Sequence, residues 1–176
     1  MSKEPPPVLE LRRADVDCLD EILAILNSAA SWLSSKGVEQ WPDRFNADQV
    51  LPTIMQGHTW LARLDGEAAG TITIDWSDVL WDSRNHDAGY VHRLAVLRSS
   101  PGLGLRLLEW AAETVRLRGR YFVRLDCVTT NDKLRMYYEE TGFRHCGDVP
   151  VLYSKPFRAD NADSGWHSLY ELELGT

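Results

Sequence analysis

Two glycines lie where a strand-like segment gives way to an amphipathic helix. Residues 90–96 are strand-like, and Gly102-Leu103-Gly104 leads directly into the helix. Glycines at the mouth of a helix let backbone N–H groups approach a phosphate closely, and the helix N-terminus contributes about half a positive charge. The spacing therefore predicts an anion-binding turn, although the same glycines could form only a tight turn.

Two better-known nucleotide motifs are absent from the chain. A P-loop would require Gly-Lys-Ser/Thr, which the sequence lacks. A dinucleotide-binding fingerprint would require a small residue at Leu107 and a position early in a βαβ unit rather than in the middle of the chain. The predicted anion site therefore belongs to neither of these two classes.

The rest of the chain predicts strands and helices that would position this turn. Strands are expected at residues 8–13, 59–64, 69–76, 90–96, 121–127, 143–146 and 169–174. Helices are expected between Asp15 and Gly37, across residues 46–55, from the glycine turn to about Arg118, and from Asn131 or Asp132 to Gly142. Pro52 is expected to weaken or divide the second helix. The order predicts an α/β fold of mixed α+β type, with a central twisted mixed β-sheet of about six or seven strands and helices on both faces.

Length and composition indicate one globular domain. The 176 residues suffice for a full hydrophobic core, with a disordered N-terminal lead-in at residues 1–7 and a single domain at residues 8–176. The net charge of −7 argues against nucleic acid as a partner. No apolar run approaches the roughly 20 residues of a membrane span. The three scattered cysteines fit neither a disulfide framework nor a metal site, so a cytoplasmic protein without a metal is expected.

Three motifs resemble the GNAT family of acetyl-CoA-dependent N-acetyltransferases. They are His92-Arg93-Leu94-Ala95-Val96, similar to the fourth strand of the family; Gly102-Leu103-Gly104 leading into Leu107-Leu108-Glu109-Trp110-Ala111, similar to its pyrophosphate loop and helix; and Asn131 followed by Tyr138-Glu139-Glu140-Thr141-Gly142-Phe143. Their order and mutual distances also match, over roughly residues 88–146. The resemblance implies transfer of an acetyl group from acetyl-CoA to a primary amine by direct attack in a ternary complex.

The resemblance assigns acetyl-CoA binding to the glycine turn and the preceding strand. Backbone N–H groups of the turn would hold the diphosphate, and free backbone groups of the strand would lie along pantetheine and the thioester. These positions are Gly102, Leu103 and Gly104 in the turn and Leu94, Ala95 and Val96 in the strand. The turn is about two residues shorter than the family pattern, and Ser99 stands where the family has Arg or Gln. Arg98 or Arg106 could supply the missing charge, or the backbone alone could hold the diphosphate.

The resemblance implies that Tyr138 donates a proton to the departing CoA thiolate. A phenol with a pKa of about 10 can protonate a thiolate of similar basicity without a large mismatch. The neighbouring Tyr137 is the alternative, in which case Tyr138 would be a packing residue. Asn131 would bond to the cofactor or to nearby backbone, or would only cap the helix that follows it.

The base that accepts the amine proton is expected on or beside the strand at residues 90–96. Many family members have a carboxylate early in this strand, where the present chain has Tyr90. His92 lies two residues further along the same face and titrates in the required range. Asp75 could act through a water molecule. His92 could instead be a hydrogen-bonded structural histidine, and the other four histidines show no partner spacing.

The acceptor is expected to be an amphipathic small-molecule amine, such as a polyamine, an amino-acid derivative or an aminated metabolite. Tryptophans near the expected acceptor segments are Trp32, Trp41, Trp76 and Trp81, and the alternative for each is packing. Negative charge in the same segments comes from Glu39, Asp43, Asp75, Asp78 and Asp82.

Two further functions fit the same motifs. One is a catalytically weak CoA-binding sensor or regulatory module, and the other is an enzyme that uses a longer acyl-CoA. Turnover with a panel of amines distinguishes the first from an acetyltransferase, and the dependence of binding on acyl length distinguishes the second. Homodimers are common in the family, so the resemblance also allows a homodimer.

Overall fold

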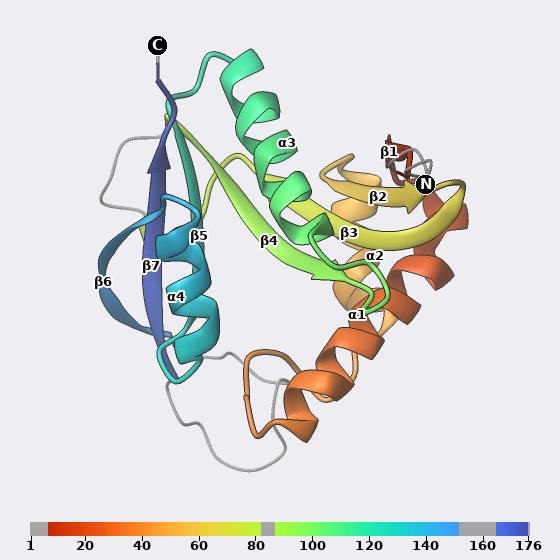
Figure 1. Ribbon diagram of the computed structural model, residues 1–176, viewed down its shortest axis with the longest axis horizontal. Coiled ribbons are helices and arrows are strands. Elements are labelled where there is room, and N and C mark those ends of the chain that lie inside the picture. Colours follow the sequence, from red (N-terminus) through yellow and green to blue (C-terminus); the bar gives the residue numbers. More distant parts are fainter. Residues whose placement is uncertain (1–6, 82–86, 152–164, 176) are drawn as a thin grey trace, which may run out of the picture.

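One twisted seven-stranded sheet organises the computed structural model, which describes residues 7–81, 87–151 and 165–175 (Figure 1). Its strands are β1 (Leu9–Arg13), β2 (Thr59–Leu64), β3 (Glu67–Asp75), β4 (Ala88–Val96), β5 (Phe122–Val128), β6 (Arg144–Val151) and β7 (Gly165–Glu173). They lie in the order β1-β2-β3-β4-β5-β7-β6, with β4 and β5 parallel and the other neighbours antiparallel. The predicted lead-in at residues 1–7 falls outside the described residues except for Pro7.

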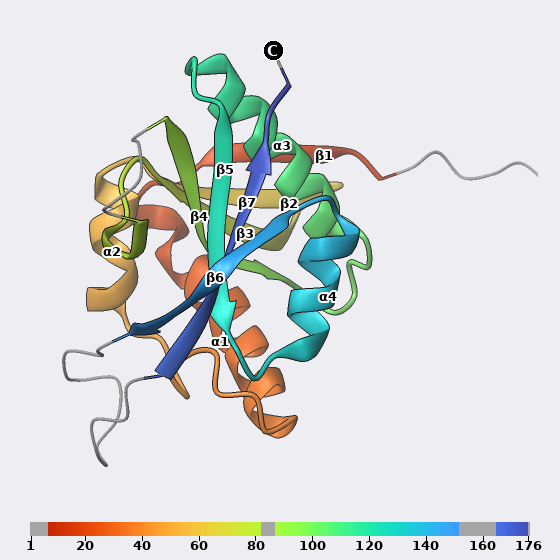
Figure 2. The same ribbon diagram turned by 90° about the vertical axis from the view of Figure 1, so that its left-hand side faces the viewer.

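Helices cover both faces of this sheet (Figures 1 and 2). They are α1 (Leu19–Ser35), α2 (Ala47–Met55), α3 (Leu103–Leu117) and α4 (Asp132–Glu140), with short 3-10 turns η1 (Val16–Cys18) and η2 (Val79–Trp81). Ile22 on α1 and Val50 on α2 belong to one hydrophobic core. Leu107 on α3 and Tyr138 on α4 belong to a second core. The predicted mixed sheet with helices on both faces is therefore confirmed. Within the described part of the chain, none of these helices is long and apolar enough to cross a lipid bilayer.

The second helix is continuous although it contains a proline. Asn46 and Gln49 form a reciprocal capping box at its start, with distances of 3.2 and 2.9 Å between the paired atoms. Val50 and Ile54 on the same helix are buried. Pro52 removes one intrahelical hydrogen bond, but the cap and the buried side chains keep the helix intact. The prediction that Pro52 divides this helix is wrong.

A β-bulge interrupts the pairing of β4 with β3. Thr71 faces Ala95 and Thr73 faces His92, so β4 has one residue more than β3 between these two pairs. Arg93 lies inside this interval with a φ of +49°, a left-handed conformation that few residues other than glycine adopt. The bulge therefore breaks the regular alternation of side chains in the segment predicted to face the cofactor.

The parallel strands β4 and β5 separate soon after they begin to pair (Figure 1). Their pairing runs only from Ala88 opposite Phe122 to Tyr90 opposite Arg124. Buried Arg124 marks the point of separation, where Nε lies 2.8 Å from Glu171 Oε2 and Nη1 donates a 3.1 Å hydrogen bond to the Tyr90 hydroxyl. Beyond this point the two strands leave a wedge open between them.

Candidate active site

A cleft of about 1350 Å³ lies at this wedge and is also bordered by residues of α1, of the glycine turn and of α4. It brings together most of the residues predicted for the site. The predicted residues on its wall are Trp32, Trp41, Asp75, His92, Leu94, Ala95, Val96, Arg98, Gly102, Gly104, Asn131 and Tyr138. Pockets for one drug-sized ligand measure roughly 300–1,000 Å³, so this cleft exceeds the usual range for a single small ligand.

Two of the tryptophans predicted to contact the acceptor lie elsewhere. Trp76 packs under the guanidinium groups of Arg118 and Arg120, 4.1 and 5.1 Å from the ring centroid, beside a separate cavity of about 230 Å³. Trp81 is only 1% exposed and packs against Tyr90 in the core. The prediction of acceptor contacts is corrected for both residues, because each packs within the fold away from the cleft.

The glycine turn begins α3 at the edge of the cleft. Gly102 is the N-cap residue with a φ of +80°, and a Cβ atom at this position would meet no other atom within 4 Å. Glycine is therefore required here by backbone conformation rather than by space. Leu103 turns its side chain into the core, and its N–H donates to the Ser100 carbonyl over 3.3 Å. The first turn of α3 presents its remaining N–H groups at the edge of the cleft.

Of the two arginines considered for the missing charge, one reaches the cleft. Arg98 lies on the cleft wall, and its guanidinium lies 4.3 Å from the ring centroid of Trp32 on α1. Arg106 is exposed on α3 and lies outside the cleft wall. The Arg98 guanidinium, which lies over the Trp32 ring, can therefore contact an anion bound beside the turn. Arg106 does not line the cleft.

The strand segment from Leu94 to Val96 has one paired and one open edge. Ala95 and Val96 pair with Thr71 and Gly70 of β3. On the other edge, the pairing of β4 with β5 has already ended at Tyr90 within the described part of the chain. This open edge lines the cleft and offers backbone groups to an extended ligand, as an added strand would use them.

Tyr138 on α4 lines the cleft and packs within a group of aromatic side chains. Its ring centroid lies 5.8 Å from Phe143 and 5.6 Å from Tyr170. Burial, together with the nearby Cys127 and Asp126, raises the pKa of Tyr138 far above its ordinary value, so the phenol stays protonated. Tyr137 also lines the cleft but is only half-buried, and its hydroxyl lies against Gly104, 3.4 Å from where a Cβ would stand.

Asn131 performs the helix-capping role that the sequence left open. Its side-chain oxygen accepts a 3.2 Å hydrogen bond from the Leu134 N–H at the start of α4. The residue is 93% buried and still contributes to the cleft wall. The N-cap role is confirmed, and contact with a cofactor remains a prediction.

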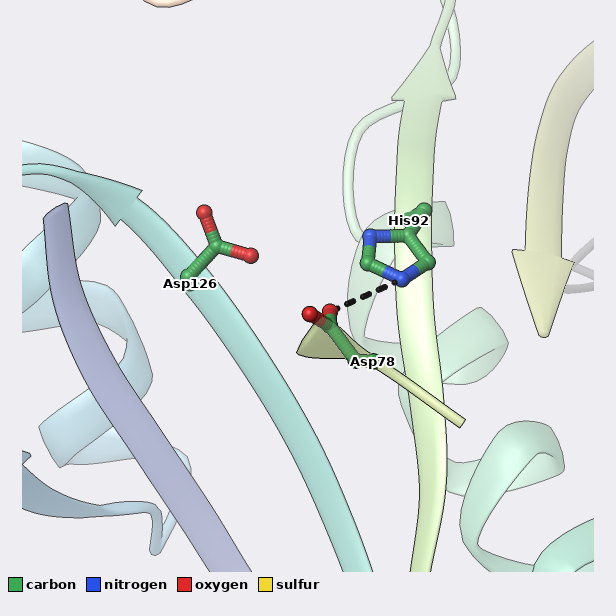
Figure 3. A group of neighbouring side chains, drawn as sticks. All are labelled: Asp78, His92 and Asp126. Atoms are coloured by element: carbon green, nitrogen blue, oxygen red, sulfur yellow. Dashed lines mark ion pairs between the residues drawn. The ribbon is translucent and has the colours of Figure 1, made fainter. Parts of the chain in front are cut away.

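His92 and Asp78 form an acid–base pair at the wedge (Figure 3). The Nε2 atom of His92 lies 3.2 Å from Asp78 Oδ2 and 3.8 Å from Asp75 Oδ2. Asp78 is fixed in turn by a 2.8 Å hydrogen bond from the Leu80 N–H. Burial acts to lower the pKa of His92, but the hydrogen bond and charge of Asp78, with smaller effects of Asp126 and Asp75, raise it overall. Burial acts to raise the pKa of Asp78, and its contacts with His92 lower it overall.

Two further His–Asp pairs flank His92, although the sequence showed no partner spacing for them. His58 Nδ1 lies 2.6 Å from Asp75 Oδ1, and His167 Nδ1 lies 2.5 Å from Asp126 Oδ2 across the wedge. The ligand atoms of Asp78, His92 and Asp126 all lie within 4.8 Å of one another, so the wedge concentrates negative charge around the imidazole. Sequence reasoning missed Asp126, although a carboxylate between buried Leu125 and Cys127 was an available signal.

A strand that leads through a glycine turn into a helix is the arrangement that the sequence motifs predicted, and the structure adds a bulge in this strand and its separation from the parallel neighbour. The sequence pattern of the acetyltransferase (GNAT) family matches residues 24–143 of the chain. The chain belongs to this family, and the resemblance inferred from the motifs is confirmed. The protein is therefore an acetyltransferase.

Individual relatives agree with this assignment. The chain is 28% identical over 166 residues to the uncharacterized N-acetyltransferase YesJ of Bacillus subtilis, covering 88% of this chain and 84% of the relative. A GNAT-family acetyltransferase from Listeria monocytogenes superposes with a TM-score of 0.71 at 25% identity, covering 94% of this chain and 95% of that one. YncA from Salmonella typhimurium, whose structure contains acetyl-CoA, has a TM-score of 0.68 at 17% identity, covering 96% and 95%. The last similarity shows the fold alone.

Proposed function

We propose that the protein transfers the acetyl group of acetyl-CoA to the primary amine of a small molecule within a ternary complex. The observation that supports this is that a single cleft contains a helix N-terminus with a glycine turn, an open strand edge and a His–Asp pair. The first two features suit a phosphorylated, extended cofactor, and the third suits removal of a proton from an amine.

The chain's own groups have distinct tasks in this proposal. The turn at Gly102 and the α3 N-terminus bind the diphosphate, and Arg98 adds a charge-assisted contact. The open edge at Leu94–Val96 aligns the pantetheine arm, with the thioester next to the backbone of Ala95 and Val96. Held in this way, the carbonyl carbon faces the space between His92 and Tyr138, so an amine that enters there is already close to its target.

Two proton transfers accompany the exchange of bonds. The amine nitrogen forms a bond to the thioester carbon, and the carbon–sulfur bond breaks with its electron pair on sulfur. His92 accepts a proton from the amine, with Asp78 stabilising the imidazolium that results. Tyr138 donates its phenolic proton to the thiolate and regains one from solvent. Because burial raises the pKa of this phenol, Tyr138 is a weaker acid than a free tyrosine, and the match of acidities expected from the sequence is lost. Asp75 is the alternative base, acting through a water.

Calorimetric titration with acetyl-CoA and CoA, followed by a thiol-release assay with a panel of primary amines, tests the proposal. We expect micromolar binding that weakens when the diphosphate is removed, and release of free CoA only when an amine is present. Binding without turnover of any amine would instead favour a CoA sensor. Preference for a longer acyl chain would change the donor but keep the reaction class.

A further inference from the structure

Arg93 is a cationic side chain on the cleft wall that the proposed reaction does not use. Its only hydrogen bond to a described residue is a 3.4 Å contact from Nη1 to the Thr53 hydroxyl, and no described carboxylate forms an ion pair with it. The side chain is half-buried, and this burial lowers the pKa of the guanidinium even though Asp75 acts in the opposite direction. A guanidinium that is partly withdrawn from water and makes one long hydrogen bond to the protein is stabilised when an anion binds to its remaining donors.

The bulge turns Arg93 toward the same side of the sheet as His92. Thr53 on α2 accepts from Arg93 and also receives a 2.9 Å hydrogen bond from Thr59. Thr59 in turn lies 3.0 Å from Thr73, the cross-strand partner of His92. In a regular strand, successive side chains would point to opposite faces, but here the left-handed Arg93 follows His92 into one region.

The cleft wall therefore presents carboxylates around His92 and a guanidinium at the next residue, Arg93. Asp75, Asp78 and Asp126 surround His92 with carboxylates, which favours an ammonium group there. One residue further along β4, the unpaired guanidinium of Arg93 favours a carboxylate, which it can bind in a bidentate manner. An α-amino acid carries both groups on a single carbon atom.

We propose that the acceptor of this acetyltransferase is an α-amino acid whose carboxylate binds to Arg93. The inference rests on the proposed function, because it names the acceptor class of the same site. The ammonium group lies among the carboxylates around His92, and the side chain of the amino acid extends toward Trp41 and Phe45, which line the cleft with ring centroids 5.5 Å apart. Apolar amino acids are therefore suitable probes.

The test compares each amino acid with the amine that lacks its carboxylate. L-Phenylalanine is paired with phenethylamine and with L-phenylalaninamide, and L-leucine is paired with isoamylamine. For the wild-type protein we expect kcat/KM to be about 10- to 100-fold higher for the acids, as a charge-assisted contact would give. Arg93→Met should remove most of this preference while leaving the amines almost unaffected, and Arg93→Lys should restore part of it.

Matched controls keep this test independent of folding and of cofactor binding. Arg116→Met removes a guanidinium that pairs with Glu113 on α3 outside the cleft, and it should change every rate by less than about twofold. The Kd of acetyl-CoA should be unchanged by Arg93→Met. A weaker acetyl-CoA complex, or an equal loss for acids and amines, would overturn the inference.

Calorimetry with the amino acids alone separates this inference from the proposed function. Binding of L-phenylalanine that is lost in Arg93→Met, without acetyl transfer to any amine, would support the carboxylate site and refute the transferase proposal. Turnover of amines without preference for a carboxylate would leave the transferase proposal intact and refute the inference. Absence of both binding and turnover across the panel would refute both.

Discussion

The two walls of the cleft differ in the chemical groups that they present to it. The wall that we propose binds the cofactor (the cofactor wall) comprises the edge of β4 at Leu94–Val96 and the turn at Gly102, and it presents mainly backbone groups held by a bulge and a left-handed glycine. The acceptor wall, around His92, Asp78 and Arg93, presents charged side chains supplied by several elements. Backbone groups depend on conformation, whereas the charged groups depend on residue identity. Substitutions should therefore affect the two walls in different ways.

Loss of the proposed base should produce the largest effect on the acceptor wall. His92→Ala is expected to lower kcat/KM for acetyl transfer by about 10²- to 10⁴-fold, the usual contribution of a general base, with little change in the Kd of acetyl-CoA. Steady-state kinetics and calorimetry measure the two quantities. His145→Ala, which alters an exposed histidine paired with Asp148, is the control. A folded His92→Ala protein that retained more than about a tenth of the activity would exclude His92 as base.

Replacing the proposed acid should have the next largest effect. Tyr138→Phe keeps the aromatic contacts with Phe143 and Tyr170 and removes only the hydroxyl, so we expect kcat to fall by roughly a hundredfold without loss of stability. Tyr137→Phe should change kcat by less than about threefold, because its hydroxyl lies beside Gly104 instead. The opposite ranking in single-turnover rates would transfer the role of proton donor to Tyr137.

A conformational substitution should affect only the cofactor wall. Gly102→Ala places a side chain at a φ of +80°, which costs about 1–2 kcal/mol and should raise the Kd of acetyl-CoA by up to roughly tenfold as the turn relaxes. Gly119→Ala is the matched control, because Gly119 lies just beyond the C-terminal end of α3, with a φ of +71° and equally open surroundings. It should lower stability similarly and leave the Kd unchanged. Equal Kd values for both variants would show that the turn does not bind the cofactor.

A smaller effect on the acceptor wall should appear in the pH dependence. Asp78 raises the pKa of His92 above its ordinary value, and only neutral His92 can accept a proton. The acid limb of kcat/KM should therefore lie above the ordinary histidine pKa and move to lower pH in Asp78→Asn. Asp148→Asn alters the His145–Asp148 pair, which is not among the groups that shift the pKa of His92, and should leave the profile in place. An acid limb that did not move would mean that another group governs it.

Removal of metal ions should have the smallest effect. The cluster of Asp78, His92 and Asp126 is close enough to hold a cation, but the proposed reaction needs a free imidazole. Dialysis against a chelator is therefore expected to leave acetyl transfer unchanged. A loss of activity that Zn²⁺ or Mg²⁺ restores would contradict the proposed role of His92.

The cofactor wall could be predicted from the sequence because its parts are contiguous. The segment from Leu94 to Gly104 contains the end of the strand, the turn and the start of the helix, and a glycine that must adopt a positive φ is visible in the sequence itself. The same contiguity made the order of strands and helices predictable. The continuity of α2 through Pro52 was not, because it depends on a cap and on buried contacts that outweigh the local penalty.

Much of the acceptor wall could not be predicted because it depends on tertiary contacts. Asp126 reaches His92 from another strand, and Asp78 is held by a 3-10 turn that no periodicity indicated. Arg93 turns toward the cleft only because the bulge breaks the alternation of the strand. The count of tryptophans could not show which are buried, and Trp81 proved to be part of the core.

The ion pair between Arg124 and Glu171 closes the narrow end of the wedge, at the last paired residues of β4 and β5. Because β4 and β5 diverge from this point, a small change in the angle between them here would produce a larger change in the width of the cleft further along the strands. The walls proposed for the cofactor and for the acceptor both include residues of β4, so loss of Arg124, which would remove a buried ion-pair partner of Glu171, is expected to disturb both.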